Sequence, residues 1–527
     1  MKTDSQKAYL IGGGIASLAS ATYLIHDGKF LGKNIFIFEQ AKEVGWSLDG
    51  NGSSEAGYTI RGIRLFLERD YNCTLDLLSL IPLEKNSSKT LLDDFNDFNK
   101  EVKIEAKARL VEKGKIIDSS KFGLKVAQML KIIDIISLPE SFLHETMISD
   151  HFPPSFFETN FWFEFCTTFS FQPWHSAVEF RRYVLRSIHE IRKINTLTVG
   201  RHTRYNQYDS IILPMTSWLE EQGVNFIMES QVSSLEFVKN DGKEKINKIT
   251  YLKNEKQNEI TVGENDLVFF TNGSITANST FGSMTSAPLL NTDTRNPWEL
   301  WENISKGRPH FGNPMVFSSQ IDKSKWISFS VTLKGRTFLD SMENFSGNKS
   351  GTGGGTTIKD SNWLISIIIP HQPHFIKQPS NINVFWGYGL HPDKEGNFVH
   401  KKMSECNGEE ILTEVCLHLG FTKDLEAILQ SANCIPCMMP YITSQFLPRK
   451  KSDCPLVIPK NTKNFAFIGQ FCEIPNEISF TVEQSVRSAM IAVKKLLRIK
   501  KKIPPIYKNK NFKEIIKENF LNIHSFR

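Results

Sequence analysis

The spacing of apolar and polar positions predicts a strand, a turn, a helix and a second strand near the start of the chain. Residues 9–11 form a short apolar run that ends in three glycines, and the uncharged segment 15–25 has the length of a helix. Residues 34–38 then alternate in a β-rich pattern and bring Glu39 to the end of a strand. This order of elements predicts a dinucleotide-binding βαβ unit.

The glycine turn and the acid supply the chemistry that such a unit needs. Glycines at Gly12 and Gly14 let the backbone approach a pyrophosphate at the N-terminus of the following helix. The carboxylate of Glu39 can accept hydrogen bonds from a ribose 2′-hydroxyl, which favours an adenosine ribose over a 2′-phosphate. The third position of the glycine motif is Ser17, so the prediction depends on the strand before it and the acid after it.

The same segment has a second interpretation, because residues 8–25 are uncharged and long enough for a signal peptide or a membrane span. Three consecutive glycines, the acidic Asp4 and the lack of a small-residue cleavage site argue against it. We therefore keep the dinucleotide-binding interpretation.

Later segments predict a β-rich half that returns to the cofactor. The apolar run 267–270 ends in Thr-Asn-Gly273, as flavin-binding domains do where their second half meets the cofactor. The aromatic run 156–171 is too apolar for a surface and belongs to the core or to the wall of a substrate cavity. Helices are predicted at 122–150, 210–222 and 481–497, a meander at 224–228, 232–238, 246–253 and 259–262, and buried strands at 363–369, 384–388 and 464–469.

Composition indicates a globular protein with a large core. Of 527 residues, 40% are hydrophobic and 23% are charged, which is ordinary for a soluble chain. Eight cysteines in so long a chain do not form a disulfide framework, and they favour a reducing cytoplasm. The single C-x-x-C pair, Cys434 and Cys437, lacks a second pair, so we interpret it as structural thiols and expect no metal.

The net charge of +6 is concentrated at the end of the chain. Residues 494–527 hold 11 lysines and arginines against two glutamates, a local charge of +9. The apolar residues of 512–523 recur at helical spacing beside this basic face. Two interpretations stay open, a helix docked on its own domain and a reversible contact with an anionic membrane. No base-reading module accompanies the charge, so nucleic acid is not an expected partner.

Longer sequence words carry a resemblance to a known family. The chain resembles the oleate hydratase family, also called the myosin-cross-reactive antigens, which are flavoproteins that add water to a cis double bond of unsaturated fatty acids. The resemblance covers nearly the whole chain. The words include GGGIASLA at 12–19, SLDG at 47–50, FQPWHSAVEFRRY at 171–183, YNQYDS at 205–210, DSNWLISIIIPHQPHF at 360–375 and, between 403 and 493, ANCIPCMMPYITSQF and FTVEQSVRSAMIAV.

The resemblance implies an α/β fold with a Rossmann-like FAD-binding domain, interleaved substrate and lid domains and a C-terminal helical region. We expect the FAD-binding domain at 1–121, 224–290 and 441–498, a helical substrate-binding segment at 122–223, a substrate and lid domain at 291–440 and a basic helix at 499–527. The residues expected to hold FAD are Gly12, Gly14, Ala16, Ser17, Glu39, Ser47, Arg61, Arg64, Gly273, Gly469, Phe480 and Thr481.

Hydration of an unactivated alkene needs an acid to protonate one carbon and a base to direct water at the other. The resemblance implies that Tyr183 is the acid. It also implies a glutamate base directly after an R-G-G-R turn beside the flavin. In this chain the turn is residues 61–64 and the base position falls on Leu65 or Phe66, neither of which can take a proton.

Three further residues affect this expectation. Glu68 is the nearest carboxylate and is the candidate substitute for the base, although a solvent-facing helix acid is the commoner fate of such a residue. Trp46 and Ile63 stand where the family has glycine, and both add bulk close to the expected flavin ring.

The first function predicted is therefore a fatty acid hydratase that acts on oleate or linoleate and uses FAD without net redox. The alternatives are a flavin-binding paralogue with weak or no hydratase activity, such as a fatty-acid binder, and a flavin oxidoreductase or isomerase on fatty acids. We expect a cytoplasmic homodimer with peripheral membrane contact if the tail binds lipid.

The basic tail predicts reversible binding to anionic vesicles. Each lysine or arginine near such a surface contributes roughly 1 kcal/mol, and the apolar stripe of 512–523 adds burial. Vesicle sedimentation should show binding that salt weakens. Equal binding by a chain that ends at about Leu497 would show instead that the tail is a docked helix.

Overall fold

A computed structural model describes residues 5–67, 69–240, 242–294 and 296–507. Two predictions fall on residues outside this range. The candidate base Glu68 is one of them, and most of the predicted basic helix at 499–527 is the other. Residues 499–507, which are described, form neither a helix nor a strand.

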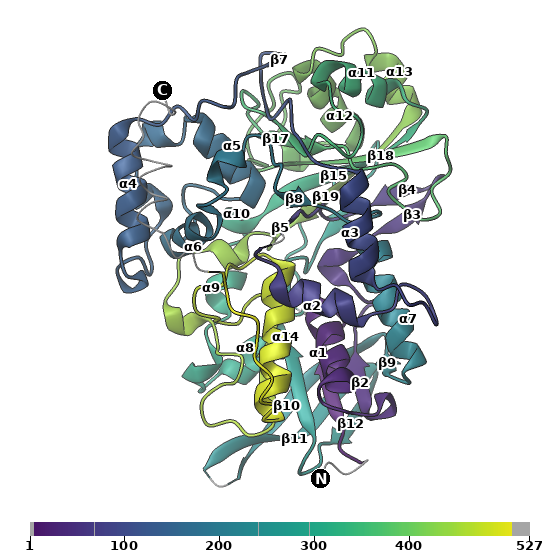
Figure 1. Ribbon diagram of the computed structural model, residues 1–527, viewed down its shortest axis with the longest axis vertical. Helices are drawn as coiled ribbons and strands as arrows, with labels where there is room; N and C mark the ends of the chain where they lie inside the picture. Colours follow the sequence, from purple (N-terminus) through teal and green to yellow (C-terminus); the bar gives the residue numbers. More distant parts are fainter. Residues whose placement is uncertain (1–4, 68, 241, 295, 508–527) are drawn as a thin grey trace.

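A parallel sheet of five strands lies at the centre of the lower half of the molecule (Figure 1). Its middle strand pairs in parallel with a neighbour on each side, so that Ala8 lies opposite both Leu267 and Ile35. The strands are short apolar runs because both faces of the sheet are covered. Their order is β20 (Phe465–Ile468), β13 (Leu267–Thr271), β1 (Ala8–Ile11), β2 (Ile35–Phe38) and β9 (Asn225–Ile227).

The last helix of the described chain packs against the first. Helix α14 (Val482–Leu496) contacts α1 (Ile15–His26), α2 (Asn72–Leu80) and β20, and Figure 1 shows α14 and α1 side by side. The predicted helix at 15–25 and the predicted helix at 481–497 are therefore both confirmed. The sheet draws on three separate parts of the chain, and α14 holds the last part against the first.

A three-stranded antiparallel sheet covers the other face of the parallel sheet. It consists of β10 (Ser230–Asn240), β11 (Lys243–Lys253) and β12 (Lys256–Thr261). Its rings pack on the parallel strands, as in the contact of Tyr251 with Phe38 at 5.1 Å between ring centroids. The predicted meander is wrong in its first strand, because β9 pairs in parallel with β2 and leaves only three strands in the meander. A parallel partner 190 residues away leaves no local signal.

A mixed sheet of eight strands forms the upper half, with α11, α12 and α13 on one side of it in Figure 1. All its pairings are antiparallel except that of β16 with β6. The predicted strands at 363–369 and 384–388 lie in its middle. The strand order is β14 (Thr280–Phe281), β19 (Ala432–Met439), β15 (Trp326–Lys334), β18 (Ile382–Gly389), β17 (Ile365–Ile368), β16 (Gly355–Ile358), β6 (Leu110–Glu112) and β7 (Lys115–Ile116).

A helical layer of α4 (Val126–Ser137), α5 (Asn160–Phe169) and α6 (Ala177–Ser187) lies beside both sheets (Figure 1). The helix predicted at 122–150 is shorter than expected, because Leu138-Pro139 ends α4 and 3-10 turns follow. Most of the aromatic run 156–171 packs into the core. Helix α6 begins after Ser176, whose hydroxyl accepts from the Glu179 amide.

The remaining elements connect these layers. The predicted helix at 210–222 is a π-helix, Tyr208–Ile212, that continues into α7 (Leu213–Glu221). Two further sheets have two antiparallel strands each: the hairpin of β3 (Asn51–Ser53) with β4 (Gly57–Thr59), and the long-range pair of β5 (Phe66–Leu67) with β8 (Gly200–Arg201). The other helices are α3 (Leu91–Glu101), α8 (Glu299–Ser305), α9 (Met315–Ser318), α10 (Ile321–Ser324), α11 (Thr337–Ser346), α12 (Gly408–His418) and α13 (Leu425–Ser431).

Strands of both large sheets alternate along the chain, and the predicted domain boundaries stay a prediction. Across the described residues, no helix has the length and apolarity that crossing a membrane requires. Residues 499–507 pack against the core, and the Pro504 carbonyl accepts from Arg487 at 2.5 Å. The vesicle comparison is therefore sharper with a chain that ends at Tyr507, which keeps these contacts.

A buried carboxylate joins the first and last parts of the chain. Glu483 on α14 accepts from the backbone amides of Cys73 and Thr74, at 3.0 and 2.8 Å, and also pairs with Arg487 at 2.8 Å. Helix α2 has no side-chain cap of its own, because its N-cap residue is Tyr71. Glu483 therefore caps α2 across 410 residues.

We expect Glu483→Ala to lower the free energy of unfolding by roughly 3–5 kcal/mol, because it leaves Arg487 buried without one of its partners and α2 without a cap. Urea unfolding followed by circular dichroism measures the change. The control is Glu409→Ala, an exposed acid in the first turn of α12, which should cost about 1 kcal/mol or less. Equal losses in the two variants would contradict a capping role for Glu483.

Candidate active site

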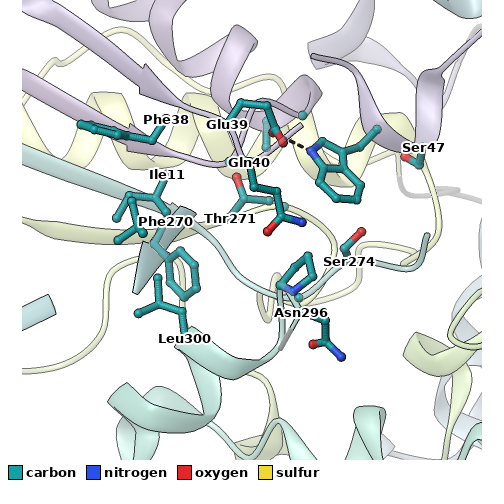
Figure 2. A pocket seen from close by; sticks show the side chains of 18 of the residues that line it. Ile11, Phe38, Glu39, Gln40, Ser47, Phe270, Thr271, Ser274, Asn296 and Leu300 are labelled. Atoms are coloured by element: carbon teal, nitrogen blue, oxygen red, sulfur yellow. Dashed lines mark hydrogen bonds between the residues drawn. The ribbon is translucent and has the colours of Figure 1, made fainter. Parts of the chain in front are cut away.

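The first cavity opens at the carboxyl ends of the parallel strands, where ligands bind in folds of this type. With its open mouth included it holds about 1020 Å³ of empty space. Figure 2 shows Glu39 and Gln40 on one side of it and Ser274, Asn296 and Leu300 on the other. Three chain segments that are far apart in the sequence thus form one pocket.

The glycine turn forms the floor of this cavity. Gly12 has φ of +94°, a left-handed conformation that favours glycine. A Cβ on Gly13 would lie 2.8 Å from Glu39 Oε2, so the turn can approach the acid only without a side chain there. Gly14 caps α1 with no side-chain hydrogen bond, and a Cβ on it would meet no atom within 4 Å. The N-terminus of α1 therefore opens into free space.

Glu39 lies at the end of β2 and is almost fully buried. Its carboxylate accepts from the Gly13 amide at 2.6 Å, from the Ala41 amide at 2.7 Å and from Trp46 Nε1 at 2.5 Å. Burial raises the pKa of this carboxyl, and the three hydrogen bonds oppose the shift. The acid is held firmly at the edge of the cavity (Figure 2).

Seven of the residues predicted to hold a cofactor line the first cavity. Ser17 does not, because its hydroxyl is buried beside the Thr271 hydroxyl at 3.2 Å. Sequence reasoning missed two other segments of the lining, residues 230–233 and the group Asn296, Pro297, Glu299 and Leu300, which have no local signal. The seven are Gly12, Gly14, Ala16, Glu39, Ser47, Gly273 and Gly469.

The second cavity is larger and lies between the helical layer and the eight-stranded sheet. It holds about 1460 Å³ of empty space, again with its mouth included. Most of its wall is apolar, with a few hydroxyl and cationic groups. Five predicted site residues line it, namely Arg61, Arg64, Tyr183, Phe480 and Thr481.

Tyr183 projects from α6 into this wall and is 3% exposed. Its hydroxyl donates to the backbone carbonyl of Ser479, and its ring packs edge-on against Phe169 and Phe171. Burial and nearby acidic groups, led by Tyr71, raise the pKa of the phenol well above its ordinary value. The phenol is therefore protonated at neutral pH, which is the form that a proton donor requires.

The turn 61–64 contributes two arginines with different surroundings. Arg61 is paired with Asp49 at 2.8 Å and donates to the Thr276 carbonyl. Among the described residues, the Arg64 guanidinium donates only to the Gly62 carbonyl and has no carboxylate within 4 Å. Burial lowers the pKa of Arg64 to about 10. An anionic group in the cavity would therefore stabilise the charged form of the Arg64 guanidinium.

Leu65 also lines the second cavity, close to the Gly200 backbone of β8. Phe66, the other position to which the base could map, is instead buried against Tyr71 and Phe95. Residue 65 is thus the position from which a side chain reaches the cavity. An apolar group stands there.

The cavity wall includes polar residues that sequence reasoning missed. Ser187 and Glu190 lie on α6 and just after it, about one and two turns beyond Tyr183, so helical spacing could have indicated them. Tyr71, Arg109 and Tyr388 come from distant segments and had no such signal. Glu190 is the one carboxylate of the described residues that lines this cavity.

The two cavities both have lining residues on the first turn of α14. Val482 lines the second cavity and Ser485, one turn later, lines the first. Arg61, which lines the second cavity, is bound to Asp49 and Thr276. These two partners follow Ser47 and Ile275, which line the first cavity. The first turn of α14 and the bonds of Arg61 thus connect the walls of the two cavities.

Residues 5–494 match the model of the MCRA family. This chain belongs to the MCRA family. An oleate hydratase of Streptococcus pyogenes serotype M49 (strain NZ131) is 37% identical over 513 residues, which cover 95% of this chain and 87% of that protein. A linoleate hydratase of Lactiplantibacillus plantarum is 33% identical over 526 residues, or 92% of each chain. The resemblance read from the sequence words is confirmed.

The fold of this MCRA protein has a solved counterpart. Cyclohexylamine oxidase from Brevibacterium oxydans IH-35A superposes with a TM-score of 0.53 over 94% of this chain and 99% of its own, at 9% identity. With the parallel sheet and the glycine turn, this likeness confirms the predicted α/β class and its Rossmann-like domain. The roles of individual site residues stay predictions.

Proposed function

We propose that this MCRA protein is a fatty acid hydratase, which adds water across a cis double bond of an unsaturated fatty acid such as oleate or linoleate. One observation carries the proposal. A protonated, buried tyrosine lies on the wall of a large apolar cavity beside a dinucleotide-type cradle, in a chain 37% identical to an oleate hydratase. A cavity of this volume accommodates a long hydrocarbon chain.

The proposed cofactor is FAD, and the residues of the first cavity fit it with one exception. The open N-terminus of α1 at Gly14 suits the pyrophosphate, and Glu39 suits the adenosine ribose. The Arg61–Arg64 turn would face the ring end. The exception is Trp46, whose indole N–H already donates a hydrogen bond to the Glu39 carboxylate. When bound, FAD would supply shape and charge, because hydration transfers no electrons.

The protein's own groups would carry the proton transfers. The Tyr183 hydroxyl leaves its hydrogen bond with Ser479, gives its proton to one alkene carbon and becomes a phenolate. Water then forms a carbon–oxygen bond at the neighbouring cationic carbon and loses a proton to a base. A proton from solvent restores the phenol, which its raised pKa favours. The apolar wall excludes bulk water from the cavity and holds the alkene near Tyr183.

The base is the weak point of this proposal, and Leu65 is the observation that favours a second function. With an apolar residue at position 65, the protein could bind FAD and a fatty acid while turning over slowly or not at all. Dimerisation and membrane contact stay predictions. Mass spectrometry of oleate and linoleate incubations decides between the two functions, because a hydratase adds one water to the acid.

Tyr183→Phe should lower hydratase turnover by roughly 10²-fold to 10⁴-fold, the usual contribution of a general acid, and leave folding and FAD binding unchanged. The matched variant is Tyr388→Phe, which removes another buried hydroxyl of the same cavity that donates to a backbone carbonyl. Product formation is measured for both. Equal losses would make the role of Tyr183 structural, and full activity of Tyr183→Phe would move the role to Tyr71 or Tyr388.

Leu65→Glu should raise hydration of oleate by up to roughly 10²-fold to 10⁴-fold, because it places a carboxylate in the cavity wall. Burial should raise the pKa of this acid and help it to accept a proton near neutral pH. Leu65→Gln is the control, since it has nearly the same shape and cannot take a proton.

The background rates complete this comparison. Turnover by the unmodified protein above a flavin-free control shows a hydratase that works without the glutamate, and Glu190→Gln and Glu68→Gln then identify its base. If the unmodified protein forms no product and the Leu65→Glu variant does, the protein is a disabled hydratase. If neither protein forms product while FAD is bound, hydration is refuted, and the remaining functions are a fatty-acid binder and a flavin oxidoreductase.

A further inference from the structure

The carboxylate of Glu39 already accepts three hydrogen bonds, one of them from the Ala41 amide to Oε1. Its Oε2 atom accepts from the Gly13 amide at 2.6 Å and from Trp46 Nε1 at 2.5 Å. The dashed line at Glu39 in Figure 2 marks the bond to the indole. A carboxylate oxygen offers about two lone-pair sites, so both sites of Oε2 are taken. The first bond comes from the backbone of the glycine turn, whereas the second comes from a side chain on the cavity wall.

Trp46 reaches Glu39 from an unusual backbone conformation. Gly45 has φ of +109° and its amide donates to the Gly13 carbonyl at 3.0 Å, which ties this turn to the glycine turn. Trp46 follows with φ of +47°, in the left-handed region that large side chains rarely adopt. Such a conformation costs on the order of 1 kcal/mol or more and persists where its surroundings enforce it. The bond with Glu39 is one contact that does so.

The indole also occupies space in the cradle. Trp46 is half-buried and lines the first cavity together with Glu39, Gln40 and Ser47. A ribose that uses Glu39 Oε2 must lie where the indole N–H now points. A dinucleotide whose ribose uses this oxygen and this position of the indole therefore exclude one another.

We propose that Trp46 is a latch on the dinucleotide cradle. Its indole N–H occupies the acceptor that the ribose hydroxyl needs, so the dinucleotide binds only after the indole has left Glu39. The inference rests on the proposed binding of FAD and goes beyond it, because it assigns to one residue the control of cofactor entry. The latch makes binding weaker and slower than the cradle itself would allow.

The latch predicts a specific pattern in FAD titrations of the flavin-free protein. Trp46→Phe keeps a ring and removes the N–H, and it should bind FAD roughly 10-fold to 100-fold more tightly, the value of a hydrogen bond to a charged group. Trp46→Gly removes the ring as well and should bind at least as tightly. In stopped-flow experiments the rate of binding to the unmodified protein should level off with FAD concentration, because the indole must leave first, and this plateau should vanish in Trp46→Phe.

The control variant is Trp218→Phe, which changes an indole of α7 that lines neither cavity. It should bind FAD like the unmodified protein. A second readout needs no flavin. In ¹⁵N-tryptophan spectra, the indole signal that disappears in Trp46→Phe should shift in Glu39→Gln, which weakens its acceptor, and should shift again when FAD is added to the unmodified protein.

Each outcome bears on the latch separately from the hydratase. Tighter FAD binding by Trp46→Phe supports the latch even when no variant hydrates oleate. Equal or weaker binding by Trp46→Phe and Trp46→Gly overturns it and makes the indole a stacking surface for the cofactor, whatever the turnover. If no variant binds FAD while circular dichroism shows intact folding, both the latch and the FAD proposal fall.

Discussion

The parallel pairing of four strands fixes where any ligand can bind. Strand β1 pairs with β13 and β2, and β13 pairs with β20, all in the same direction. Parallel strands place their carboxyl ends at one edge, so the glycine turn, Glu39, Gly273 and Gly469 gather there although they are separated by up to 457 residues. The second cavity then forms beside this edge, because α14 starts there and contributes to both walls.

The sequence predicted those features that short segments determine. The strand, glycine turn and helix at 8–26 follow from local periodicity, and so do α14 and the central strands of the eight-stranded sheet. What it missed depends on distant partners. The prediction assigned β9 to the meander, because only its pairing with the distant strand β2 shows that it belongs to the parallel sheet. Arg109 and Tyr388 reach the second cavity from segments that carry no common pattern.

Departures from the family pattern were visible in the sequence, but their consequences were not. Leu65, Trp46 and Ile63 all stood out as departures from the family pattern. Only the structure shows that Leu65 faces the cavity while Phe66 does not, and that Trp46 has a partner in Glu39. A substitution in a motif can thus remove one interaction or add another, and contacts are needed to distinguish the two cases.

The use of β20 in the central sheet, and of α14 to cover α1, has a consequence for biosynthesis. Strands β1 and β2 leave the ribosome more than 400 residues before residues 465–496, which complete the sheet and cover α1. Until then the nascent chain carries an unpaired edge at β13 and an uncovered apolar helix face, which are features that promote aggregation. The cofactor cradle is therefore complete only after residues 465–496 have been synthesised, because Gly469 and Ser485 belong to its wall.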